Sequence, residues 1–80
     1  MTVDYASLLT DEQKRGILQQ RISQFAAEAY QHSLNKTTCQ SLADEAGVEA
    51  ADKALAILEA AIATHQSELA ALPVVVTAGN

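Results

Sequence analysis

The chain has 80 residues, a single cysteine and a formal net charge of −5, and 49% of its residues are hydrophobic. A chain this short forms at most one small domain, and it is marginally stable alone unless a cross-link, association or tight packing supports it. One cysteine excludes an intrachain disulfide, and one cysteine with two distant histidines does not make a four-ligand zinc site. No run of about 20 apolar residues is present, so we expect no membrane partner and no membrane span.

The negative charge is concentrated in the second half of the chain. Residues 1–36 contain four acidic and four basic side chains, whereas residues 37–80 contain six acidic side chains and only one lysine. Nucleic acids and anionic lipids bind basic surfaces, so this distribution predicts no nucleic-acid partner and again no membrane partner.

Alanine dominates the apolar residues, and alanine favours helices while filling a core poorly. We expect residues 1–9 to be an extended or frayed lead-in. The segment Thr10-Asp11-Glu12-Gln13 has the pattern of a capping box, in which the Thr10 hydroxyl and the Gln13 side chain each bond the backbone of the other residue. The first helix is therefore predicted to begin here, over residues 10–46.

An apolar stripe follows with helical spacing, formed by Leu18, Ile22, Phe25 and Ala29. The same count continues through His32, Lys36, Cys39, Ala43 and Ala46. The stripe is weakest between His32 and Thr38, so the helix either continues to residue 46 or breaks near Asn35–Thr38. Because the spacing keeps its phase across the weak stretch, we favour one continuous helix.

Gly47 is the predicted turn, since glycine takes the left-handed conformation that commonly ends a helix. A second helix is predicted over residues 48–72, because Pro73 disfavours helix at the preceding residue. Its seam is more regular than the first and comprises Val48, Ala51, Leu55, Leu58, Ile62, His65, Leu69 and Leu72. A short turn makes the helices antiparallel, with Cys39 opposite Leu55 and Phe25 opposite Leu69. The sequence thus predicts an all-α, single-domain, coiled-coil-like hairpin.

A second apolar stripe lies off this seam on the second helix. It comprises Ile57 with Ala50, Ala54 and Ala61, and Tyr30 lies beside the seam of the first helix. Two helices cannot cover a second apolar face, which is typical of helices that pack on further helices. We therefore expect Ile57 and Tyr30 to contact a partner, and the chain to form a homo-oligomer or many-copy assembly or to bind a larger structural protein.

Few side chains are placed for chemistry. His32 and His65 both fall on the seam, about one layer apart in the predicted register, so a shared metal, a pH-sensitive contact and a polar interruption that fixes register are alternatives. Two ligands are too few for a typical metal site, which favours the polar interruption. Cys39 is predicted to be a small buried hydrophobic residue. A hairpin offers no cleft, so we expect no cofactor and no enzymatic activity.

The chain ends in LPVVVTAGN, and residues 73–80 are predicted to form an extended C-terminal arm. Val74, Val75, Val76 and Thr77 are all β-branched, and such a short segment cannot form a sheet alone. Addition to the edge of a neighbouring sheet, or packing along a neighbouring subunit, would account for this composition. We therefore include these four residues in the predicted partner-binding set.

The stretch LTDEQKRGILQQRISQFAAEAYQHSLN, with the Gly47 turn and the Ala/Glu-rich second helix, resembles the small helical-hairpin proteins encoded among the structural genes of tailed bacteriophages. The resemblance covers roughly residues 8–72. It implies a virion component or assembly factor of a capsid, connector or tail, made in the host cytoplasm and carrying no catalytic residues. The alternative is a small acidic adaptor or inhibitor, cytoplasmic, that covers a basic site on a larger protein.

Overall fold

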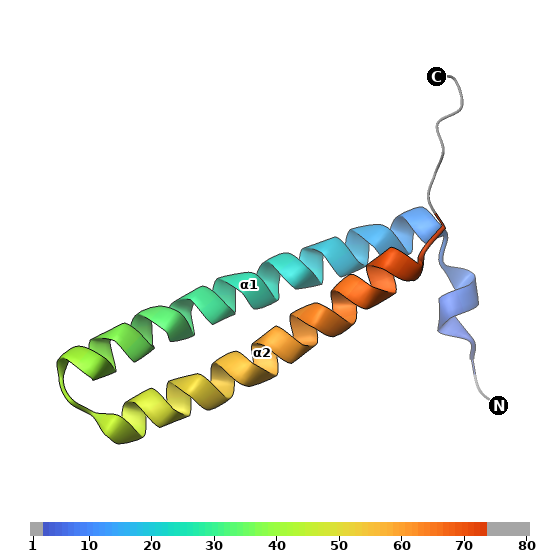
Figure 1. The fold of residues 1–80 in the computed structure, drawn as a ribbon. Helices are drawn as coiled ribbons and strands as arrows, with labels where there is room; N and C mark the ends of the chain where they lie inside the picture. The colour runs from blue at the N-terminus through green and yellow to red at the C-terminus, as the bar shows by residue number, and fades with distance from the viewer. Residues whose placement is uncertain (1–2, 74–80) are drawn as a thin grey trace.

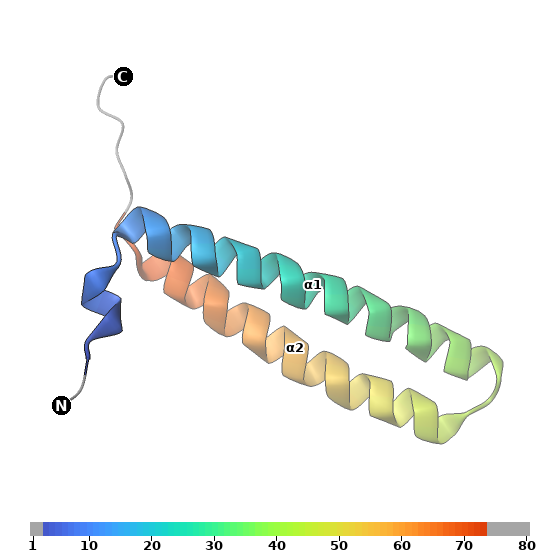
Figure 2. The same cartoon turned by 180° about the vertical axis from the view of Figure 1, so that it is seen from behind.

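The computed structural model describes residues 3–73 as one short 3-10 turn and two long helices. The turn η1 spans Tyr5–Leu8, α1 spans Asp11–Ser41 and α2 spans Glu45–Ala71. Figures 1 and 2 show α1 and α2 side by side and antiparallel, with η1 turned away from the hairpin at its open end. No strand occurs in the described part of the chain. The predicted all-helical hairpin is therefore confirmed.

The first helix begins as the sequence predicts. The Gln13 backbone N–H donates to Thr10 Oγ1 at 3.1 Å, and the Thr10 backbone N–H donates to Gln13 Oε1 at 2.8 Å. Both halves of the capping box are thus formed, which satisfies two backbone donors that the helix itself leaves free.

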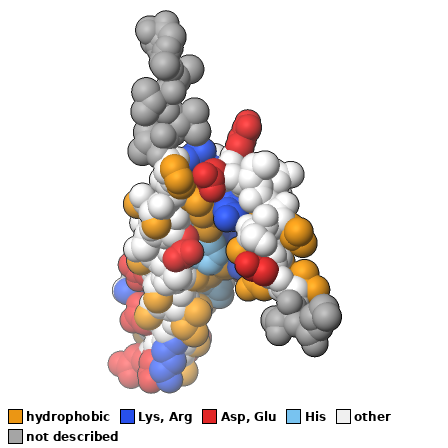
Figure 3. Space-filling model, turned by 90° about the vertical axis from the view of Figure 1, so that its right-hand side faces the viewer, with side chains coloured by type: hydrophobic (Ala, Val, Ile, Leu, Met, Phe, Trp, Pro, Cys, Tyr) orange, Lys and Arg blue, Asp and Glu red, His pale blue; other side chains and the backbone are white. Residues whose placement is uncertain are grey.

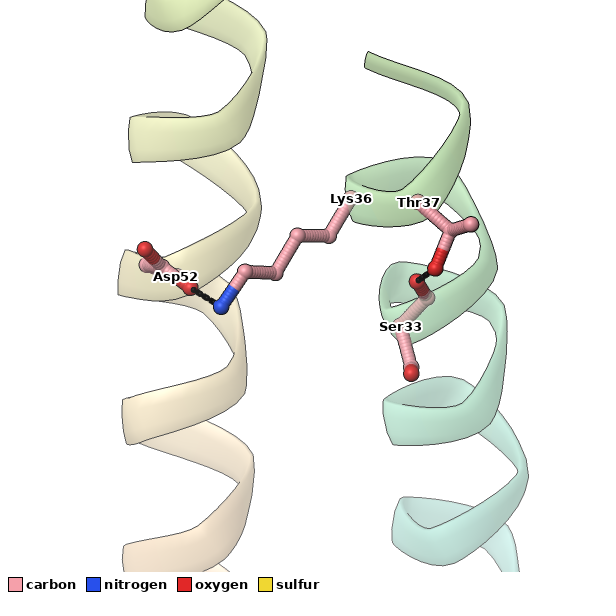
Figure 4. A network of polar contacts seen from close by, with 4 residues as sticks. All are labelled: Ser33, Lys36, Thr37 and Asp52. Carbon is pink, nitrogen blue, oxygen red and sulfur yellow. Dashed lines mark hydrogen bonds and ion pairs between the residues drawn. The ribbon is translucent and has the colours of Figure 1, made fainter. Parts of the chain in front are cut away.

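The helix also continues through the weak stretch between His32 and Thr38. The Thr37 and Thr38 hydroxyls donate to the backbone carbonyls of Ser33 and Leu34, one turn earlier, at 3.2 and 3.0 Å. These bonds satisfy the hydroxyls within the helix, so the two threonines do not interrupt it. Figure 4 shows the Thr37 bond next to Lys36, which reaches across the hairpin to Asp52. The continuous reading of this stretch is confirmed as far as Ser41.

The prediction that the chain turns at Gly47 was wrong. The helices are joined at residues 42–44, so α1 ends five residues before the expected position 46 and α2 starts three residues before position 48. Ala43 takes the left-handed conformation, with φ of 57°. Its N–H donates to Gln40 O at 3.1 Å, and the Asp44 N–H donates to Cys39 O at 2.8 Å, which together form a Schellman motif.

Asp44 is the reason that α2 starts early. Its Oδ1 accepts from the Gly47 backbone N–H at 3.0 Å, so Asp44 caps α2 and Gly47 lies in the first helical turn. Gly47 does not have a positive φ. A Cβ at this position would lie 2.5 Å from Cys39 Sγ and 2.7 Å from Asp44 Oδ2. The glycine is needed for the close approach of α2 to α1, and not for the turn.

The two helices face each other along the predicted stripes. On α1, the half-buried side chains are Leu18, Ile22, Phe25 and Ala29. On α2, Ala51 and Leu58 are buried and Leu55, Ile62 and Leu69 are half-buried, as is Leu72 just after the helix end.

The register between the helices differs from the prediction, because the turn lies four residues earlier than Gly47. Lys36 Nζ lies 2.7 Å from Asp52 Oδ1, and the Phe25 ring packs edge-on against the His65 ring at a centroid distance of 5.0 Å. Phe25 therefore contacts His65, one turn before the expected Leu69, and Lys36 pairs with Asp52, six residues before the position that the predicted register places opposite it.

Candidate protein-docking surfaces

The interior of the hairpin is small. Within residues 3–73, the only buried side chains are those of Ala51 and Leu58, both on α2. The remaining seam side chains are half-buried where the two helices meet, except Ala43 and Ala46, which are exposed. Two helices that bury so little apolar surface gain little free energy of folding from it, since burial contributes only about 25 cal/mol per Å². The hairpin therefore has more apolar surface than it can cover by itself.

Large apolar side chains are exposed on both helices. Ile57 on α2 is 70% exposed, with Ala50 exposed and Ala54 and Ala61 half-buried on the same side of that helix. Tyr30 on α1 is 66% exposed, and Leu34, one turn further along, is also exposed. Of these, Ile57 and Tyr30 are the positions that the sequence predicts for partner contact, and both are exposed in the described chain.

The last four predicted partner-binding residues, Val74, Val75, Val76 and Thr77, lie outside the described residues. The described chain closes with Pro73, whose carbonyl accepts from Arg15 Nη2 at 2.7 Å. This bond holds the point where the chain leaves α2 against the start of α1.

An apolar patch at the open end was missed by sequence reasoning. Residues 1–9 were expected to be extended or frayed, but Tyr5–Leu8 form η1, in which the Ser7 hydroxyl and N–H both donate to Asp4 O at 2.9 and 3.2 Å. Tyr5 and Leu8 are exposed. Between η1 and the hairpin lies a pocket of about 200 Å³, lined by Tyr5, Ala6, Leu9, Lys14, Ile17, Leu18, Glu68 and Leu72. Figure 3 shows hydrophobic side chains on this projecting segment as well as along the hairpin.

The signal for this patch is present in the sequence. Asp4 and Ser7 are three residues apart, the spacing at which a serine bonds back to a preceding carbonyl and starts a short turn. The apolar residues Leu8 and Leu9 then lie three and four residues after Tyr5.

His65 is held in a polar cluster at the seam. Arg21 Nε donates to His65 Nε2 at 2.9 Å, and His65 Nδ1 lies 2.7 Å from Ala61 O. In the tautomer in which Nε2 accepts from Arg21, the Nδ1–H donates to the Ala61 carbonyl. The Arg21 guanidinium also lies over the Phe25 ring, 5.2 Å from its centroid. Both ring nitrogens of His65 are thus already occupied.

The structure does not bring His32 and His65 together. The contacts of Lys36 with Asp52 and of Arg21 with His65 put His32 level with about Leu55, which is ten positions, or roughly 15 Å, from His65 along α2. Both histidines are half-buried between the helices, where Figure 3 shows the histidine side chains. Across residues 3–73, no group of three or more potential ligands is placed to hold a metal ion. The arrangement of His65 instead matches the register-fixing alternative.

Cys39 borders a second pocket, at the turn. This pocket, of about 340 Å³, is lined by Cys39, Gln40, Ala43, Asp44, Glu45, Val48, Glu49 and Asp52. Three of its carboxylates have structural partners: Asp44 caps α2, Asp52 pairs with Lys36, and Glu49 lies 3.4 Å from Lys53. Cys39 is a half-buried free thiol whose sulfur contacts the position of Gly47. Its surroundings are those of a packing residue at the helix crossing.

Neither helix in the described range is both long enough and apolar enough to cross a membrane. Comparison of the chain with protein-family models, with curated proteins and with solved structures finds no match.

Proposed function

We propose that this chain is a non-enzymatic structural or assembly protein that works by docking on copies of itself or on a larger structural protein. The observation that carries the proposal is the imbalance between interior and surface. Only two side chains of residues 3–73 are buried, while Tyr30, Leu34 and Ile57 are exposed. Exposed apolar side chains on a domain with so small a core are typical of a subunit that is completed by association.

More narrowly, we propose a small virion component of a tailed bacteriophage, such as a capsid, connector or tail accessory protein, made in the host cytoplasm. The support is the resemblance of residues 8–72 to that group and the hairpin layout itself. A rigid two-helix rod with apolar flanks can fill a groove between larger subunits in many copies.

The C-terminal segment Val74–Thr77 is proposed to close the docking contact, by strand addition to a neighbouring sheet or by packing along a neighbouring helix. Its β-branched composition supports this role. The Arg15 side chain donates a hydrogen bond to the Pro73 carbonyl. This bond would hold the start of the C-terminal segment at the open end of the hairpin.

A second candidate function is an acidic adaptor or inhibitor that covers a basic site. The observation that favours it is the net charge of −5 carried by residues 37–80 alone. Such a protein would stay monomeric until its target arrives, whereas a structural subunit forms a defined oligomer by itself or within a particle.

The test is the solution mass, by light scattering, of the full chain and of a chain truncated after Leu72. The structural proposal expects a defined oligomer for the full chain and a smaller mass for the truncated chain. A well-folded monomer in both cases would overturn self-association and favour the adaptor.

A further inference from the structure

Two exposed faces run along α2, and they differ in charge. The first, here called the neutral face, comprises Ala50, Lys53, Ile57, Ala60, Thr64 and Glu68, all exposed and spaced three or four residues apart. The second, the acidic face, comprises Glu49, Asp52, Ala56, Glu59, Ala63 and Gln66, which are also exposed. The acidic face carries three carboxylates and no cation of its own, although Asp52 pairs with Lys36 and Glu49 with Lys53 from outside this face. It therefore offers a second copy no opposite charge of its own. The neutral face carries one positive and one negative charge around an apolar centre.

We infer that the neutral face is an antiparallel contact between two copies of this chain, a specific form of the self-association on which the proposed function rests. Lys53 and Glu68 lie at opposite ends of the face, 15 positions or roughly 22 Å apart. A two-fold axis midway between them passes through positions 60 and 61. It brings Lys53 of each copy against Glu68 of the other, whereas a parallel contact would bring lysine against lysine and glutamate against glutamate.

The side chains between these charges suit the same arrangement. At the axis, Ala60 of one copy faces Ala61 of the other; Ala61 borders the neutral face and is half-buried. Small residues at this point let two helices approach to about 8 Å. Ile57, which is 70% exposed in the single chain, then lies against Thr64 of the second copy. The contact covers the largest exposed apolar side chain of α2 and makes a four-helix arrangement from two hairpins.

Both charged side chains are available for this contact. Lys53 has only a within-helix partner, Glu49, at 3.4 Å, and both of these side chains are largely exposed. Glu68 has no ion pair within residues 3–73, and its exposed side chain also lines the open-end pocket with Tyr5 and Lys14. Surface pairs of this kind add little affinity singly but select one orientation by penalising the other.

A charge-swap experiment tests the inference on the full-length chain, with the dimer dissociation constant measured by sedimentation equilibrium at low salt. Lys53→Glu and Glu68→Lys should each weaken the dimer by about tenfold, because each replaces two attractive contacts by two repulsive ones. The double variant Lys53→Glu with Glu68→Lys should return the dissociation constant to within about threefold of the wild type. The control is Glu59→Lys, which changes the net charge by the same amount as Glu68→Lys but lies on the acidic face. It should not weaken the dimer.

Helicity by circular dichroism shows that each variant keeps its fold, which these exposed positions should allow. A wild-type chain that stays monomeric would overturn the inference, and so would a double variant that is no tighter than the single variants. If the dimer dissociation constant is the same for the wild type and all four variants, the chain associates through another surface and the inference is wrong. That outcome leaves the proposed function in place, whereas a monomeric wild type would count against both.

Discussion

Arg21 on α1 and His65 on α2 are joined across the hairpin by a hydrogen bond of 2.9 Å from Nε to Nε2. The same guanidinium lies over the Phe25 ring, whose edge packs against the imidazole. The cluster combines a directional hydrogen bond with an aromatic contact at one level of the seam. These contacts favour one register of α2 along α1.

This cluster should contribute measurably to stability. Arg21→Met retains an apolar side chain but removes the hydrogen bond and the cation–π contact, and should lower the free energy of unfolding by about 1 kcal/mol. In a His65→Leu background the same substitution should cost at least about 0.5 kcal/mol less, because its partner is already gone. Urea unfolding at one fixed protein concentration gives both values. Purely additive costs would show that the two side chains do not cooperate.

Lys36 and Asp52 form a further polar contact between the helices, at 2.7 Å, with side chains that are 35% and 50% exposed. Because water and salt screen a pair of this exposure, its coupling energy should be about 0.2–1 kcal/mol. A double-mutant cycle with Lys36→Gln and Asp52→Asn measures the coupling, and 1 M salt should remove most of it. A coupling that persists undiminished in high salt would mean that the pair is shielded from solvent.

Ala43 is the residue at which backbone conformation and side chain conflict. Its φ of 57° is a region that a Cβ disfavours by roughly 1 kcal/mol or more and that glycine occupies freely. Ala43→Gly should therefore raise the free energy of unfolding by about 0.5–1 kcal/mol. The control is Ala56→Gly, an exposed helical position in α2, which should lower it by a similar amount. Destabilisation by both substitutions would contradict the assigned turn.

The two helical glycines should respond oppositely to alanine. A Cβ at Gly16 meets nothing within 4 Å, so Gly16→Ala should stabilise the helix by about 0.5–1 kcal/mol. A Cβ at Gly47 would crowd Cys39 Sγ and the capping carboxylate of Asp44, so Gly47→Ala should destabilise the chain by about 1 kcal/mol or more. Thermal unfolding of the two variants at equal concentration compares them. Equal stabilisation would mean that the helices do not approach closely at Gly47.

The periodic features of the sequence predicted the helices well. The capping box at Thr10 and the phase of Leu18, Ile22, Phe25 and Ala29 give the start of α1 and its packing face, because both signals are local. The continuous phase likewise predicted that Thr37 and Thr38 stay within the helix.

The turn and the register could not be predicted in the same way. Gly47 is the only glycine near the junction, so the common association of glycine with helix ends pointed there. The chain instead accepts the left-handed conformation at Ala43, because Asp44 then caps α2 and Gly47 allows close packing against Cys39. Both contacts join residues of different segments, so the local sequence pattern does not reveal them. The shift of one to two turns in register follows from them, and it separates His32 from His65.

The central proposal is that self-association buries the apolar surface that the single hairpin leaves exposed. The most direct test is whether the thermal unfolding of the full chain depends on protein concentration. We predict that the midpoint rises by several degrees over a hundredfold increase in concentration, since association stabilises the folded state by mass action. We also predict that helicity falls at the lowest concentration. A fully helical chain whose midpoint does not change with concentration would be a stable monomer, and would contradict the proposal that the hairpin is completed by copies of itself.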